Sequence, residues 1–284
     1  MFELSTVDRA ADQLFAHEDS AVCVREWTGT TGTVRVRAYV GTTWSWIDWD
    51  GVAIYRFRRG SNHVEALPAR HAKPKAVEDY YRRHILPLVL QANGFEAVHA
   101  SAVISDRGVL GFCGECGTGK STIAYALSRR GYPQFADDVI VMTQAHGSIE
   151  ALSLPFLPRI RVPAAQHFGN DVYTNLASDQ GSHSARSPVA ALFILERAEN
   201  GQIDPQVERL DGVEALTALL SHAQRFDSMS FSSRKRTLQN YLDVTAIVPV
   251  YSVRFANALE RLDSLLDRLV EAAGVACPEL CDVR

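Results

Sequence analysis

Nine consecutive residues, Gly114-Glu115-Cys116-Gly117-Thr118-Gly119-Lys120-Ser121-Thr122, contain the pattern G-x-x-x-x-G-K-[ST] and give the strongest indication of the fold. An apolar run of strand character, residues 108–113, precedes them, and residues 123–130 predict a helix that stops at Gly131. A strand, a glycine-rich loop and a helix form the context in which this pattern binds phosphate. Backbone N–H groups turn toward the anion, and the helix N-terminus adds partial positive charge. All nine residues are therefore candidate nucleotide-binding residues.

Two residues at the end of the pattern have defined chemical roles in sites of this kind. The Lys120 side chain reaches the β- and γ-phosphates of a nucleotide, and the Ser121 hydroxyl binds Mg²⁺. The alternative is a glycine-rich turn that only happens to precede a helix. Because every fixed position of the pattern is present between a strand and a helix, we expect a site for ATP and Mg²⁺.

Two adjacent carboxylates, Asp137 and Asp138, lie near the start of the next predicted strand, residues 134–142. Phosphoryl transfer needs a metal ligand and a group that orients or deprotonates the acceptor. Neighbouring residues of a regular strand point to opposite faces, so both carboxylates can serve one site only where the backbone turns. The alternative is one metal-binding aspartate beside a solvated or capping one.

Composition limits the classes of protein to which the chain can belong. Of its 284 residues, 46% are hydrophobic and 22% are charged, which is enough apolar material for a folded core. A net charge of −4 argues against general nucleic-acid binding, which needs a basic surface. Without an apolar run of membrane-spanning length or a signal-peptide pattern, we expect a cytoplasmic protein with neither nucleic acid nor membrane as its partner. The five cysteines predict no disulfide framework.

We expect two parts: a small β-rich N-terminal region with a linking helix, residues 1–95, and a catalytic domain, residues 96–284. Within the first part, the patterns predict a short helix over residues 2–17, strands between residues 21 and 67, and a helix over residues 75–93 that Pro87 bends or interrupts. Trp44, Trp46 and Trp49 are interpreted as core or edge packing of the small sheet. An aromatic platform for a base or a peptide is the alternative.

In the second part, residues 98–104 and 108–113 predict a hairpin that leads into the glycine-rich loop. We also expect strands at residues 149–154, 159–162, 189–195 and 246–255, and helices at residues 212–220 and 259–273. Residues 164–188 are polar and lack periodicity, which predicts a mobile loop that closes over the site when an acceptor binds.

The order of these motifs resembles that of the HPr kinase/phosphorylase family, whose catalytic domain is related to ATP-dependent phosphoenolpyruvate carboxykinases. That family has a histidine in a strand, a glycine-rich loop ending in G-K-S, a helix ending in R-G, and then A-D-D. The corresponding residues of this chain are His99, Gly117-Thr118-Gly119-Lys120-Ser121, Arg130-Gly131 and Ala136-Asp137-Asp138. The resemblance implies an α/β fold, with a P-loop-containing mixed sheet of the HPr kinase and phosphoenolpyruvate carboxykinase type preceded by the small β-rich region.

The resemblance also implies roles for individual residues. Asp137 is implied as the catalytic base toward an acceptor hydroxyl, and Asp138 as the Mg²⁺ ligand together with Ser121. His99 is implied to lie close to the phosphates or to Asp137, and Lys120 completes the catalytic set.

The chain departs from the family pattern in three places. Cys116 stands where the family has a serine, the long N-terminal regulatory domain is not evident, and the second, arginine-containing motif is only echoed at residues 159–162 and 168–169. The pattern is more similar to the shorter HPr-kinase-like proteins of peptide-biosynthesis clusters, which include lasso-peptide kinases that phosphorylate a serine of a precursor.

We therefore expect an ATP-dependent kinase that transfers the γ-phosphoryl group to a hydroxyl, with a serine of a peptide or protein, precursor-peptide or HPr-like, as the acceptor. A kinase of a small hydroxylated metabolite such as free serine is one alternative, and a non-catalytic nucleotide-binding regulatory module is another. The pair Asp137 and Asp138 beside Lys120 favours catalysis, because a protein that only binds nucleotide needs no acceptor base. Peptide and metabolite acceptors both stay open, as does assembly into a homo-oligomer.

Overall fold

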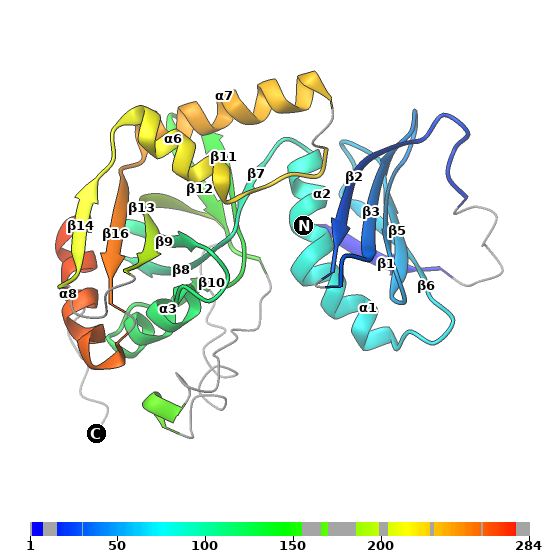
Figure 1. The fold of residues 1–284 in the computed structure, drawn as a ribbon. Helices are drawn as coiled ribbons and strands as arrows, with labels where there is room; N and C mark the ends of the chain where they lie inside the picture. The colour runs from blue at the N-terminus through cyan, green and yellow to red at the C-terminus, as the bar shows by residue number, and fades with distance from the viewer. Residues whose placement is uncertain are drawn as a thin grey trace. The chain divides into compact units, whose positions relative to one another are not determined.

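The computed structural model describes residues 2–7, 16–29, 31–154, 166–169, 186–198, 204–227, 230–256 and 258–276. The chain divides into two units, one of Met1–Ala97 with Gln224–Thr237 and one of Val98–Ala223 with Leu238–Arg284. Each unit has its own sheet (Figure 1). Residues 224–237, which the sequence analysis assigned to the second part, belong by their contacts to the first unit.

The first unit contains a six-stranded sheet in the order β1-β6-β5-β4-β3-β2. Its strands are β1 (Glu3–Thr6), β2 (Val22–Thr28), β3 (Val34–Val40), β4 (Ser45–Trp49), β5 (Ala53–Phe57) and β6 (His63–Pro68). Neighbouring strands are antiparallel except for β1 and β6, which are parallel. Alternation along β5 buries Tyr55 and Phe57 completely, so this sheet has a core of its own.

A helical segment follows the sheet and packs against it. The segment consists of α1 (Pro74–Tyr80), a π-helical turn (Tyr81–Ile85) and α2 (Leu86–Ala92). The Tyr55 hydroxyl donates a hydrogen bond to the Val77 carbonyl oxygen at 2.8 Å, which ties β5 to α1. Pro87 has no N–H to continue the α-helical ladder, and the wider π-helical turn lies directly before it. The interruption expected at Pro87 is thus confirmed as a change of helix type.

The N-terminal residues differ from their expected structure. A helix over residues 2–17 is wrong at its start, because Glu3–Thr6 forms β1. Leu4 lies opposite Val64 in the parallel pair with β6, so pairing with a distant strand outweighs the local helical periodicity. Residues 8–15 of the expected helix lie outside the described residues.

The tryptophans of the first sheet occupy different environments. Packing in the core is confirmed for Trp46, whose side chain is 1% exposed. Trp44 is half-buried, and the guanidinium groups of Arg56 and Arg58 lie 4.3 and 4.4 Å from its ring centroid. Both contacts are cation–π interactions that stabilise the first unit. The Trp44 ring therefore has partners inside its own unit.

The second unit is built on a sheet with the order β10-β8-β9-β13-β12-β11. Strand β16 also pairs with β13, and β14 pairs with β16. Its strands are β8 (Ala100–Ser105), β9 (Gly108–Gly114), β10 (Gln134–Ala136), β11 (Ile140–Ala145), β12 (Ser148–Leu152), β13 (Arg186–Arg197), β14 (Gln206–Arg209) and β16 (Val250–Phe255). Strands β9, β13 and β16 are parallel to one another, whereas β8 and β9 form an antiparallel hairpin. The short strands β7 (Glu96–Val98) and β15 (Ala223–Gln224) lie where the chain passes between the units.

Helices cover both faces of this second sheet (Figure 1). One face packs against α3 (Lys120–Arg129) and α8 (Leu262–Ala273), which follows a 3₁₀ turn (Leu259–Arg261). The other face packs against α6 (Gly212–Ser221) and α7 (Phe231–Ile247). Only the part of α7 from Leu238 onward belongs to the second unit. Along β9, Phe112 belongs to the first of these cores and Cys113 to the second, as alternation predicts. The structure thus confirms a mixed α/β protein with two mixed sheets.

Most elements expected in the second part are present. The hairpin before the glycine-rich loop, the strands at β12 and β13, and helices α6 and α8 are confirmed. The strand expected over residues 246–255 is shorter, because α7 continues to Ile247 and β16 begins at Val250. The strand expected at residues 159–162 and most of the loop expected at residues 164–188 lie outside the described residues.

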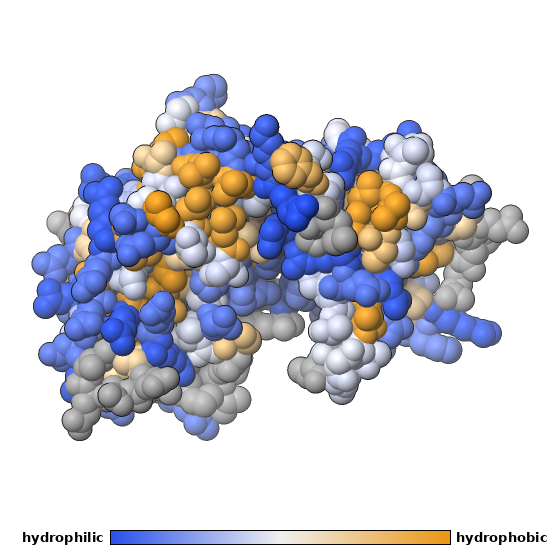
Figure 2. All heavy atoms as spheres, turned by 45° about the horizontal axis from the view of Figure 1, so that its top comes forward, coloured by the Kyte–Doolittle hydropathy of each residue, from blue (hydrophilic) through white to orange (hydrophobic). Residues whose placement is uncertain are grey.

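The surface of the second unit contains exposed apolar side chains over α6 and α7, where Figure 2 shows hydrophobic residues gathered on the visible face. The exposed apolar side chains of these two helices include Val213, Leu238, Leu242 and Ile247. In the part of the chain that the structure describes, none of the helices has the length and apolar character needed to cross a membrane.

Gly108, the first residue of β9 after the β8–β9 turn, gives a stability prediction. Its φ is +124°, and a Cβ atom there would overlap with the Pro188 carbonyl oxygen. We expect Gly108→Ala to lower the free energy of unfolding by about 2–4 kcal/mol, from backbone strain and steric overlap together. Gly147, in the β11–β12 turn, has a φ of +80° with nothing within 4 Å of its Cβ position. Gly147→Ala is the matched control and should cost only about 1 kcal/mol. Denaturant unfolding measures both, and equal losses would contradict the packing argument.

Candidate active site

The glycine loop, residues 114–119, connects the end of β9 to the start of α3. Gly119 is the N-cap residue of α3, with a left-handed φ of +110° and no side-chain capping hydrogen bond. The nearest atom to a Cβ placed on Gly119 would be Arg197 Nη2 at 3.9 Å, so the backbone is open at this point. An uncapped helix N-terminus beneath an open glycine backbone fits a phosphate group.

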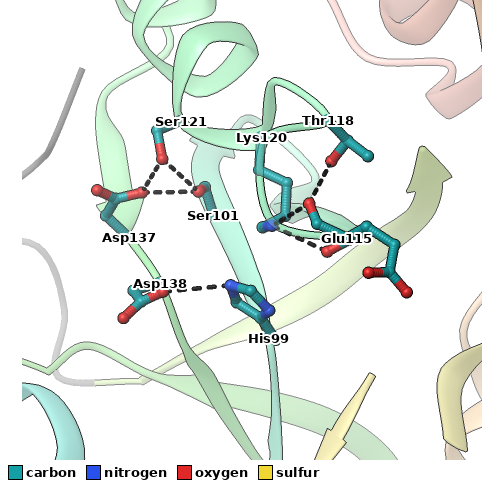
Figure 3. A network of polar contacts seen from close by, with 9 residues as sticks. His99, Ser101, Glu115, Thr118, Lys120, Ser121, Asp137 and Asp138 are labelled. Carbon is teal, nitrogen blue, oxygen red and sulfur yellow. Dashed lines mark hydrogen bonds and ion pairs between the residues drawn. The ribbon is translucent and has the colours of Figure 1, made fainter. Parts of the chain in front are cut away.

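Lys120 turns its ammonium group into the glycine loop (Figure 3). Its Nζ donates hydrogen bonds to the Gly114 and Glu115 carbonyl oxygens at 2.8 and 3.0 Å, and the residue is only 6% exposed. Burial lowers the pKa of Lys120 from its ordinary value, and the neighbouring Cys116, Asp138, Cys113 and Asp137 oppose that shift. The loop therefore holds a cationic group at its centre.

Asp137 joins the first turn of α3 to strand β8 of the neighbouring hairpin. Its Oδ1 accepts hydrogen bonds from the hydroxyls of Ser121, at the start of α3, and Ser101, on β8, both at 2.7 Å (Figure 3). The two hydroxyl oxygens are 3.3 Å apart. Two hydroxyls and a carboxylate at one point form an all-oxygen donor set of the kind that Mg²⁺ prefers.

The predicted strand over residues 134–142 is interrupted at the acidic pair. Strand β10 ends at Ala136, β11 begins at Ile140, and Asp138 between them has a left-handed φ of 73°. Aspartate tolerates this conformation better than most residues. The break lets both carboxylates face the site, which an unbroken strand would not allow. The condition set in the sequence analysis, a turning backbone at the pair, is therefore met.

Asp138 lies close to His99, which precedes β8 (Figure 3). The distance from His99 Nε2 to Asp138 Oδ1 is 3.2 Å, and the side chains are 31% and 53% exposed. The structure thus pairs Ser121 with Asp137 and His99 with Asp138. The family resemblance implied that Ser121 and Asp138 together bind Mg²⁺. In the structure, Ser121 contacts Asp137 instead, and Asp138 contacts His99.

His222 is a residue of the site that the sequence analysis missed. The His222 backbone carbonyl oxygen accepts a hydrogen bond from the His99 backbone N–H at 2.9 Å, which joins the end of α6 to the start of β8. Burial lowers the pKa of the half-buried His222 ring, the charges of His99 and Lys120 lower it further, and Glu115 opposes them. The ring is therefore within electrostatic reach of the glycine loop.

Arg197 is a second residue that the sequence analysis missed. It ends β13, and its Nε donates a hydrogen bond to the Thr118 carbonyl oxygen at 3.2 Å. The apolar run at residues 189–195 predicted the strand, but only the pairing of β13 with β9 brings its last residue to the loop.

The cysteines of the site have contrasting environments. Cys113 is buried, and burial raises the pKa of its thiol to about 12, whereas Cys116 is exposed in the glycine loop. Among the described residues, no three histidine, cysteine, aspartate or glutamate side chains are grouped so that they could hold a metal. A magnesium ion bound with a nucleotide needs only one or two protein ligands, because it keeps water and phosphate oxygens in its shell.

The chain is similar in part to solved structures of known proteins. No protein-family model and no curated protein matches the chain. A solved structure described as the Hpr(Ser) kinase/phosphatase from Coxiella burnetii is 18% identical with a TM-score of 0.33, and the match covers 62% of this chain and 96% of that one. Chains that are alike at this level can differ in activity.

Proposed function

We propose that the chain is an ATP-dependent phosphotransferase that transfers the γ-phosphoryl group to an alcohol, most simply the serine hydroxyl of a peptide or protein. The observation that carries this proposal is the position of two carboxylates, Asp137 and Asp138, beside a loop that already contains the Lys120 ammonium group. A site that only bound nucleotide would need a metal ligand but no second carboxylate.

The phosphate side of the site consists of the glycine loop and the first turn of α3. The backbone amides there and the Lys120 ammonium group would bind the polyphosphate. Ser121 Oγ and Asp137 Oδ1, which are 2.7 Å apart, would hold Mg²⁺, and the ion would offset the charge that develops on the transferred group.

The acceptor side consists of Asp138 and His99. In this proposal Asp138 takes the proton of the acceptor hydroxyl, and the His99 ring at 3.2 Å orients that carboxylate. This division exchanges the roles that the family resemblance implies for Asp137 and Asp138. The reason is that the Ser121 hydroxyl, the expected Mg²⁺ ligand, is hydrogen-bonded to Asp137. A serine-containing partner, a cytoplasmic location and self-assembly stay predictions.

Cys116 provides a test of nucleotide binding that needs no acceptor. A ligand in the glycine loop would shield this exposed thiol, so ATP with Mg²⁺ at ten times its Kd should slow alkylation by iodoacetamide about tenfold, in proportion to occupancy. Cys23, exposed on β2 of the other unit, is the internal control and should react at an unchanged rate. Peptide mass spectrometry follows each site separately. Equal alkylation of Cys116 with and without saturating ATP and Mg²⁺ would count against nucleotide binding in this loop.

A further inference from the structure

Arg197 lies against the glycine loop but has no part in the chemistry proposed above. Its Nε is fixed by the Thr118 carbonyl oxygen at 3.2 Å. Its Nη2 is 3.9 Å from the position that a Cβ atom would take on Gly119. The guanidinium group is therefore held beside the loop at the point where the loop has no side chain of its own.

The strand order separates two sides of the loop (Figure 1). On one side of β9 lies β8, with Ser101 and, through β10, Asp137. On the other side lies β13, parallel to β9, and then β16, parallel to β13. Ligands of α/β sheets bind beyond the carboxyl ends of parallel strands, and β9, β13 and β16 end at the same edge of the sheet.

The two sides suit the two ends of a nucleotide. The terminal phosphate belongs near Asp137 and the acceptor groups, on the β8 side. A polyphosphate in the loop then directs its nucleoside toward the β13 side, where Arg197 lies opposite Phe255 at the ends of β13 and β16.

We propose that Arg197 binds the nucleoside end of the nucleotide, with its guanidinium plane stacked on the purine base. The inference rests on the proposed function, because it needs a nucleotide in the glycine loop. Arginine suits this role since its guanidinium group is planar, weakly hydrated and stacks on aromatic faces. The hydrogen bond from Nε to the Thr118 carbonyl oxygen keeps the guanidinium group beside the loop before the base arrives.

The test compares ATP with inorganic tripolyphosphate, each with Mg²⁺, by calorimetry on the full chain. Tripolyphosphate has the phosphates without the nucleoside. Because Arg197 is exposed, Arg197→Ala should weaken ATP binding about fivefold, the size of a cation–π contact at an exposed site, and change tripolyphosphate binding by less than about twofold. Arg197→Lys keeps the charge but lacks the plane, so we expect it to lose most of the same affinity for ATP.

A matched control is available on the same strand. Arg186, at the opposite end of β13, is exposed and paired with Glu150 at 3.6 Å, so Arg186→Ala should bind both probes like the wild type. Equal losses for both probes in Arg197→Ala would mean a phosphate contact or a loosened loop, and unchanged ATP binding would mean no contact; either result overturns the inference. Wild-type protein that binds neither probe would instead overturn the proposed function, and the inference with it.

Discussion

Replacing Lys120 by alanine is expected to weaken the binding of ATP with Mg²⁺ by about 100-fold, on the order of 3 kcal/mol. The reason is that Lys120 is the cation inside the glycine loop, where its Nζ contacts the Gly114 and Glu115 carbonyl oxygens and the residue is 6% exposed. Charge-assisted hydrogen bonds to phosphate in such a sheltered position are among the strong ones. Phosphoryl transfer should fall at least as far as binding does.

The Lys120 variant needs two controls, because removing a buried side chain can disturb the loop itself. Lys120→Met keeps most of the stem and removes only the charge, so it should lose ATP affinity to a similar extent. Lys75→Ala, on the exposed surface of α1 in the other unit, should bind ATP like the wild type. Calorimetry measures the affinities and thermal unfolding checks the fold. A folded Lys120→Met protein with wild-type affinity would mean that ATP does not bind in this loop.

The residues of the glycine loop could be identified from the sequence because they are contiguous. The covalent chain alone keeps the glycines, Lys120 and Ser121 together once a strand precedes them and a helix follows. The acidic pair was also predictable, since the helix after the loop returns the chain to the same sheet. Which carboxylate contacts Ser121 depends on the left-handed backbone at Asp138, and no spacing in the sequence encodes that torsion.

Residues that approach the site from distant elements could not be predicted. His222 follows α6 and is separated from His99 by more than a hundred positions, so their 2.9 Å hydrogen bond depends on tertiary packing. Arg197 depends on the strand order, which places β13 beside β9. Helix α7 was missed because Leu238 and Leu242 are exposed, which blurs the apolar period of its buried residues such as Tyr241.

The second large effect concerns the two carboxylates. We expect substitution of Asp138 to lower the rate of phosphoryl transfer, and substitution of Asp137 to weaken nucleotide binding. Asp138→Asn should keep ATP–Mg²⁺ affinity within a few-fold and lower phosphoryl transfer by roughly 10²–10⁴, the range for a positioned acid–base group. Asp137→Asn should instead weaken nucleotide binding about tenfold or more in the presence of Mg²⁺ and much less in EDTA, because it removes a charge from the metal site. Both changes preserve side-chain shape, and the amide oxygen introduced by Asp137→Asn could still accept from Ser121, so thermal unfolding should be nearly unchanged.

The opposite pattern has a defined meaning. If Asp137→Asn binds ATP and Mg²⁺ normally but transfers no phosphate, Asp137 is the base and the roles implied by the family resemblance hold. Calorimetry with and without Mg²⁺, followed by single-turnover transfer for each variant, distinguishes the two assignments.

The central claim, transfer of the γ-phosphoryl group to an alcohol, is tested most directly with γ-labelled ATP and Mg²⁺. The acceptors are two pools of otherwise identical degenerate peptides without threonine or tyrosine, one with a single central serine and one with alanine at that position. A parallel reaction contains free L-serine. We expect the wild type to label the serine pool and leave the alanine pool unlabelled, and Asp138→Asn to lose that labelling. Label on free serine alone would assign a metabolite as the acceptor. Saturating ATP binding without label on any hydroxyl and without ADP formation would contradict a kinase and leave a protein that only binds nucleotide.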